Sequence, residues 1–154
     1  GAGAGATVGK WRGLDRARPG GLGLEVTERE GIVVAALFVV NSTGDPDDGA
    51  AATAVLNGEF DSWPDTGILR LGRRDNTTLG VLVTNAQLSK ADCLLVAQSG
   101  HDGIARALFP AHTRFDGDAV VAVSTGTADG GPDAVDTVRV LATVAAEQAI
   151  RKAC

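Results

Sequence analysis

The chain lacks tyrosine and methionine entirely, and aromatic residues make up only 4% of its 154 residues. It has two cysteines, Cys93 and Cys154, which is too few for a disulfide scaffold. This shortage favours a reducing compartment and predicts a cytoplasmic protein. No apolar run reaches membrane-spanning length, and the longest, at residues 32–40, has the length of a core strand. The sequence therefore argues against a membrane protein.

Positive charge is also scarce, because 14 Lys and Arg residues stand against 19 Asp and Glu residues, for a net charge of −5. This balance argues against a nucleic-acid-binding surface. A hydrophobic fraction of 44% is typical of a globular chain, and we expect residues 1–154 to form one domain. The chain opens on alternating Gly and Ala without an initiator Met or a signal-peptide pattern, so we expect it to be the latter part of a longer precursor.

Hydrophobic periodicity predicts an α+β domain built in layers. The expected strands lie at residues 6–11, 22–28, 32–40, 78–84 and 119–124. The run at 32–40 is apolar throughout, which predicts burial on both faces. Residues 50–75 are irregular and polar, and we expect them to form a linker.

Two helices are expected in the second half. Ser89 with Asp92 resembles a capping box that opens a helix to about residue 108. Its expected buried face comprises Ala91, Leu94, Leu95, Ile104, Ala105 and Leu108. Pro132 and Asp133 open the last helix, whose expected apolar stripe comprises Val135, Val138, Leu141, Ala142, Ala145 and Ala149.

The Gly-rich start does not make a nucleotide site. Gly9-Lys10 lacks the earlier glycine of a phosphate-binding loop, and Trp11 stands where that loop has Ser or Thr. The spacing of Gly1, Gly3 and Ala6 fits a dinucleotide fingerprint, but no strand precedes it and no helix pattern follows it. Close backbone packing explains these glycines better.

The most informative stretch is Asn76-Thr77-Thr78-Leu79-Gly80-Val81 at the start of a β-like run. If the bond before Thr77 is cut, this residue carries a hydroxyl nucleophile and an α-amino base with a pKa of roughly 8. Elsewhere in a sequence the same residues would indicate little. Their meaning depends on the chemistry-bearing residues around them.

Three other polar positions accompany this stretch, namely Lys10, Asn41 and the pair Asp116 and Asp118. Taken alone, Lys10 is explained as a surface lysine and Asn41 as a turn-capping residue. Asp116 and Asp118 are two apart before a strand, so both carboxylates could face one site, where mutual repulsion would raise one pKa. The alternatives are a solvated turn or half of a metal site.

His101 and His112 are the remaining acid–base candidates. No Gly-x-Ser-x-Gly elbow accompanies them, so a Ser-His-Asp hydrolase is unsupported. Neither has a metal-ligand spacing with the acidic pair. Structural hydrogen bonding is the better explanation for both, and no motif requires a metal ion or a cofactor.

In combination these motifs resemble the self-cleaving DmpA-type aminopeptidases, a group that includes L-aminopeptidase/D-esterases, β-peptidyl aminopeptidases and nylon-oligomer hydrolases. The matching segments, in family order, are 5–10, 39–41, 76–81, 101–106, 110–113 and 116–118. The resemblance implies a four-layer αββα sandwich of the kind found in N-terminal-nucleophile hydrolases. It covers essentially the whole chain as the latter portion of such an enzyme.

The resemblance implies self-cleavage between Asn76 and Thr77, with residues 1–76 ending the large subunit and 77–154 forming the small one. Thr77 would then be the nucleophile. Asp116 and Asp118 match the acidic pair of nylon-oligomer hydrolases, whereas β-peptidyl members have Ser and Glu at these positions. Lys10 matches the supporting lysine. Asn41 matches the asparagine that serves as the oxyanion donor.

The implied substrates are small peptides, amino-acid amides or amide oligomers. The implied partners are the N-terminal portion of the same precursor and further copies, in a homo-oligomer such as a tetramer of processed units. Family members carry an aromatic hydroxyl near the oxyanion site, and this chain has no Tyr to supply it. Two alternatives are an acyltransferase like the ornithine acetyltransferases, which share the fold, and a non-catalytic, uncleaved homologue.

Overall fold

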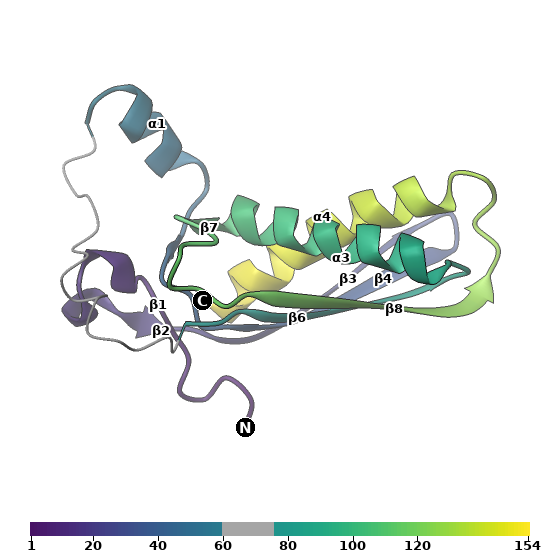
Figure 1. Ribbon diagram of the computed structural model, residues 1–154, viewed down its shortest axis with the longest axis horizontal. Helices are drawn as coiled ribbons and strands as arrows, with labels where there is room; N and C mark the ends of the chain where they lie inside the picture. The colour runs from purple at the N-terminus through teal and green to yellow at the C-terminus, as the bar shows by residue number, and fades with distance from the viewer. Residues whose placement is uncertain (60–75) are drawn as a thin grey trace.

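The fold is organised around a four-stranded sheet with strand order β3-β4-β6-β8, which two long helices cover on one face (Figure 1). The computed structural model describes residues 1–59 and 76–154. The four main strands are β3 (Gly21–Arg29), β4 (Ile32–Val40), β6 (Leu79–Ala86) and β8 (Ala119–Ala128). The helices are α1 (Ala50–Leu56), α3 (Lys90–Ala107) and α4 (Ala134–Ala153). Short elements complete it: β1 (Thr7–Val8), β2 (Arg18–Pro19), β5 (Asp45–Pro46), β7 (Leu108–Phe109) and the 3-10 turns η1 (Lys10–Arg12) and η2 (Leu14–Arg16).

Strands β3 and β4 form an antiparallel hairpin in which Arg29 pairs with Ile32. The two residues between them, Glu30 and Gly31, both have positive φ angles, of 52° and 81°. Two-residue turns with positive φ at both positions are favoured in hairpins because their twist matches that of the strands. Glycine adopts a positive φ at little cost, as Gly31 does here. Both strands agree with the sequence prediction to within one residue at each end.

Helix α3 connects β6 to β8, which run parallel, while β4 and β6 run antiparallel. The predicted capping box is confirmed at its first turn, where Asp92 N donates to Ser89 Oγ and Ser89 N donates to Asp92 Oδ2. These bonds satisfy backbone donors that a helix start leaves without intrahelical partners. Because β6 and β8 run parallel, both strands begin at the same edge of the sheet.

Helix α4 lies against β3 and β4, so closely that no Cβ could fit on Gly23 beside the backbone of Ala149. Its predicted apolar stripe is confirmed at Val138, Ala142 and Ala145, which are fully buried. The predicted face of α3 is confirmed at Ile104 and Leu108 but wrong at Leu94, which is 61% exposed. Small residues, among them Gly100, Gly103 and Ala107, make up much of the buried side instead. On that side a Cβ on Gly103 would lie 2.5 Å from the Cβ of Ala146.

The opposite face of the sheet is apolar and uncovered in the described part of the chain. Its exposed side chains come from all four strands: Leu22, Leu24, Val26, Leu37, Leu79, Val81, Val121 and Val123. The prediction that residues 32–40 are buried on both faces is therefore wrong here, since Leu37 is 41% exposed. The described residues contain one helical layer and one main sheet, which are two of the four layers expected.

Two further predictions need correction. The run 6–11 is a strand only at Thr7–Val8, because Gly9 adopts a left-handed φ of 77° and the chain turns into η1. The expected linker begins with helix α1, so it is not irregular throughout. The rest of that prediction, residues 60–75, lies outside the described residues.

Candidate active site

The candidate site lies where the end of β4, the entry to β6 and the entry to β8 meet at one edge of the sheet. Asn76 forms a parallel bridge with Asp116. Thr77 N donates to the Asn41 carbonyl at 2.7 Å, and Gly117 N donates to the Asn76 carbonyl at 2.8 Å. The peptide bond between Asn76 and Thr77 is therefore held by backbone bonds from two neighbouring segments.

Gly117 lies directly beside the Thr77 side chain. A Cβ built on Gly117 would lie 3.1 Å from Thr77 Oγ1 and 3.8 Å from the Asn76 carbonyl oxygen. Asn76 is buried and Thr77 is half-buried. The absence of a side chain at position 117 thus leaves the Thr77 hydroxyl room beside the carbonyl that precedes it.

Asn41 and Lys10 lie together on the other side of Thr77. Lys10 is only 7% exposed, and its Nζ donates to Asn41 Oδ1 at 2.9 Å. Thr7 N donates to the same oxygen at 3.1 Å. Lys10 is therefore a buried, hydrogen-bonded cation rather than a surface lysine. Because Oδ1 receives both bonds, the side-chain nitrogen is the donating end of Asn41.

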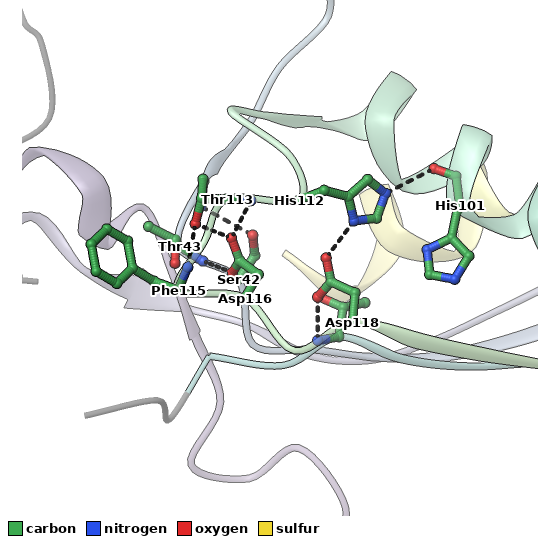
Figure 2. A network of polar contacts seen from close by, with 10 residues as sticks. Ser42, Thr43, His101, His112, Thr113, Phe115, Asp116 and Asp118 are labelled. Carbon is green, nitrogen blue, oxygen red and sulfur yellow. Dashed lines mark hydrogen bonds and ion pairs between the residues drawn. The ribbon is translucent and has the colours of Figure 1, made fainter. Parts of the chain in front are cut away.

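The Asp116 carboxylate joins the end of β4 to the loop before β8 (Figure 2). Its Oδ1 accepts from Thr43 N at 2.9 Å. Its Oδ2 accepts from Thr113 N at 3.0 Å and from Thr113 Oγ1 at 2.5 Å. Three donors on one carboxylate, one of them from a segment 73 residues away, fix the position of this loop relative to the strand.

The Asp118 carboxylate contacts a different set of groups. Its Oδ1 accepts from Thr78 N, the residue after Thr77, at 2.8 Å, and its Oδ2 lies 2.8 Å from His112 Nδ1. Its side chain is only 5% exposed. Asp116 and Asp118 thus hold different segments, and Asp118 is the one bonded to the backbone beside Thr77.

His112 and Gly117 are the site residues that reasoning from the sequence missed. Both lie in segments that carry the resemblance, but the sequence favours a structural role for His112 and assigns no role to Gly117. His101 lies beside His112, with ring centroids 5.0 Å apart. Burial and the neighbouring His112 lower the pKa of His101, while Asp118 and Asp102 oppose that change.

Two findings bear on other kinds of site. Within residues 1–59 and 76–154, no three His, Cys, Asp or Glu side chains lie close enough together to hold a metal ion. Among the helices of those same residues, none combines the length and apolar character that a membrane span needs.

Known proteins resemble this chain over its whole length or most of it. The model of peptidase family S58 matches residues 1–154, the whole chain. An uncharacterized aminopeptidase of Mycobacterium tuberculosis is 39% identical over 131 residues, which are 75% of this chain and 38% of that protein.

Two solved structures share the fold at low sequence identity. The β-aminopeptidase of Burkholderia sp. superposes with a TM-score of 0.66 at 22% identity, over 99% of this chain and 44% of that one. The L-aminopeptidase D-Ala-esterase/amidase of Ochrobactrum anthropi, described as a variant of the Ntn-hydrolase fold, gives a TM-score of 0.63 at 21% identity, over 99% and 43%. The expected α+β fold is thus confirmed.

The chain spans about 38% of the length of the mycobacterial relative it matches. Within that span the fold and the family model agree. The resemblance to the DmpA-type aminopeptidases is confirmed, and the chain belongs to peptidase family S58.

Proposed function

We propose that this chain carries the catalytic centre of a self-processing aminopeptidase that hydrolyses amide bonds with Thr77 as its N-terminal nucleophile. The observation that carries the proposal is the geometry of the Asn76–Thr77 bond. Its carbonyl accepts a 2.8 Å bond from Gly117 N, and the Thr77 hydroxyl lies beside Gly117, where a Cβ would be 3.1 Å away. The proposed nucleophile Thr77 Oγ1, the Asn76 carbonyl and the donor Gly117 N thus lie close together.

In the processing step, Thr77 Oγ1 adds to the Asn76 carbonyl carbon. The bond from that carbon to the Thr77 nitrogen breaks, and the nitrogen takes up the hydroxyl proton to become a free amine. Water then opens the resulting ester, which leaves a carboxylate on Asn76 and restores the hydroxyl of Thr77. Gly117 N is positioned to donate to the carbonyl oxygen as negative charge develops on it.

In the processed protein, the Thr77 amine acts as the base for its own hydroxyl, which attacks the substrate amide carbon. The side-chain nitrogen of Asn41 serves as the oxyanion donor, a role whose loss typically lowers the rate by ~10²–10³. Lys10, held against Asn41 Oδ1, contributes positive charge that favours the neutral amine. Asp116 and Asp118 hold the loops that frame the nucleophile, and they orient the hydroxyl during proton transfer.

The two products of cleavage are held together by the sheet itself. Strand β4, before the bond, pairs with β6, after it, from Val34↔Thr84 to Val39↔Leu79. Helix α4, also after the bond, covers β3 and β4. A large subunit ending at residue 76 and a small subunit 77–154 would therefore remain one folded unit. We place the N-terminal portion of the same precursor against it, with processed units assembling as a cytoplasmic homo-oligomer, as in the expected tetramer.

The substrate class is proposed from the acidic pair. Aspartate at both 116 and 118 favours the nylon-oligomer-hydrolase-like branch, so amide oligomers join small peptides and amino-acid amides as candidates. An acyltransferase would pass the Thr77-bound acyl group to an amine instead of water. A non-catalytic homologue would keep an intact chain.

The test uses the full-length protein and three variants. Thr77→Ala should give an intact chain without hydrolysis of amino-acid p-nitroanilides, whereas Thr77→Ser should restore cleavage and activity. The matched control is Thr53→Ala on α1, which should behave as the wild type. Cleavage and hydrolysis that persist in Thr77→Ala would refute the proposal, and product formed only with an added amine acceptor would favour the transferase.

A further inference from the structure

A chain of contacts links the surface of the site to the backbone beside the nucleophile (Figure 2). His112 Nδ1 lies 2.8 Å from Asp118 Oδ2, and Asp118 Oδ1 accepts from Thr78 N at 2.8 Å. The Asp118 side chain is 5% exposed, whereas that of His112 is 38% exposed. The His112 ring therefore lies on the solvent side of a buried carboxylate that holds the residue next to Thr77.

The ring is itself held in place from its other side. His112 Nε2 lies 3.4 Å from the His101 carbonyl oxygen, and the His101 ring is 5.0 Å away, centroid to centroid. A carboxylate and a carbonyl both accept hydrogen bonds, so each ring nitrogen of His112 faces an acceptor. The ring is thus held between the Asp118 carboxylate and the α3 backbone at His101.

The backbone at His112 adopts an uncommon conformation. Its φ angle is 52°, in the left-handed region where non-glycine residues are uncommon and Asn, Asp and His are enriched. His112 lies in the loop between β7 and β8, and from there its ring reaches Asp118.

We propose that His112 is a positioning residue for the nucleophile: it fixes the Asp118 carboxylate, which in turn fixes the backbone at Thr78 and the orientation of Thr77. This inference rests on the proposed function of Thr77. His112 touches neither the Asn76–Thr77 bond nor a substrate in this scheme. Its effect passes through Asp118, so it should change the rate of the chemical steps and leave substrate affinity unchanged.

The experiment compares His112→Asn with His112→Asp in the full-length protein. The two side chains have nearly the same shape, and both residue types tolerate the backbone φ at this position. Asn keeps a donor near the place of Nδ1, whereas Asp puts a second carboxylate beside Asp118. His112→Gly, which accepts positive φ and has no donor, is a third variant in case the Asp variant does not fold.

Three quantities are measured: the rate of cleavage, kcat and KM for an amino-acid p-nitroanilide, and hydrogen exchange of the Thr78 amide in a Thr77→Ala background. We expect His112→Asn to stay within about threefold of the wild type, and His112→Asp and His112→Gly to lower kcat at least about tenfold with KM unchanged, in line with lost positioning. The Thr78 amide should exchange faster in the latter two.

Equal rates in the Asn, Asp and Gly variants would overturn the inference while leaving the role of Thr77 intact. An effect on KM alone would also overturn it, because it would place His112 in substrate binding. The exchange measurement needs no activity, so it still decides whether His112 fixes the Thr78 backbone if Thr77 proves not to be the nucleophile.

Discussion

Around Thr77, backbone groups do most of the positioning. The amide of Thr77 is fixed by the Asn41 carbonyl and the Asn76 carbonyl by Gly117 N. Thr78 N is fixed by Asp118. Because these bonds come from two segments distant in the sequence, at Asn41 and at Gly117 and Asp118, the geometry of the Asn76–Thr77 bond depends on the folded sheet edge and not on local sequence alone. A short peptide with the same residues would not reproduce it.

The residue-scale prediction concerns Gly117. Gly117→Ala puts a Cβ 3.1 Å from Thr77 Oγ1, a distance at which the hydroxyl must shift by a few tenths of an ångström. We expect the rate of cleavage to fall by roughly 10-fold or more, because misplacement of a reacting group on this scale is costly. Time-resolved gel analysis of freshly made protein measures it.

The control is Gly5→Ala, where an added Cβ meets no atom within 4 Å. It should be cleaved at the wild-type rate. Cleavage of Gly117→Ala at that same rate would show that the space beside Thr77 Oγ1 has no role in processing.

Reasoning from the sequence identified Lys10 and Asn41 as candidates only because of their place in the family order. Taken alone, Lys10 is explained as a surface lysine and Asn41 as a turn-capping residue. In the structure their side chains are hydrogen-bonded, although they lie 31 residues apart in the sequence. Gly117 and His112 were missed for a different reason. Gly117 contributes its backbone N–H, and His112 contributes a contact with the Asp118 carboxylate. Neither contribution can be predicted from residue type or spacing.

At the scale of elements, the strands and the α4 stripe were predictable because their hydrophobic periods are regular. The face of α3 was not, since the large residues Leu94 and Leu95 are not its most buried ones. Helix α3 packs on α4 through Gly103 and on the sheet through Gly100, where a Cβ would approach Val120 and Leu82. Close helix packing selects small residues, and a hydrophobicity pattern gives them little weight.

An ion-pair cluster predicts how the α3–α4 contact responds to acid. Burial alone would raise the pKa of Glu147, but hydrogen bonds from Arg106 and Arg151 outweigh it and lower this pKa. A lowered folded-state pKa stabilises the fold above the unfolded value of 4.5, and this contribution disappears as the pH falls through the folded value.

Relative to Glu147→Gln, the wild type should therefore be more stable at pH 7, with the difference shrinking as the pH falls below 4.5. Urea denaturation followed by circular dichroism across this range measures it. A difference that stays constant down to acid pH would contradict the assigned cause. Asp102→Asn, on α3 whereas Glu147 lies on α4, is the control.

At the scale of the whole molecule, the main feature is the apolar face of the sheet, which no described residue covers. Eight large apolar side chains are exposed on it. A contiguous patch of this kind on a folded domain marks a surface that associates with another. The αββα architecture that the resemblance implies includes a second sheet, and we expect it to pack on this face.

Two valine substitutions test the patch in the isolated chain. Val121 lies on β8 in the uncovered face and is 58% exposed, while Val140 lies on α4 and is 66% exposed. We expect Val121→Lys to lower binding of a hydrophobic fluorescent dye by about twofold, since a charge interrupts the patch, and Val140→Lys to leave it unchanged. Equal effects of the two substitutions on dye binding would show that the uncovered sheet face is not the surface that binds the dye.

The central claim is that the Asn76–Thr77 bond is cut by the protein itself to expose Thr77. N-terminal sequencing of the full-length protein, purified and separated under denaturing conditions, tests it most directly. A second polypeptide beginning Thr77-Thr78-Leu79-Gly80 is expected in active protein. A single intact chain in a preparation that hydrolyses amino-acid p-nitroanilides would contradict it.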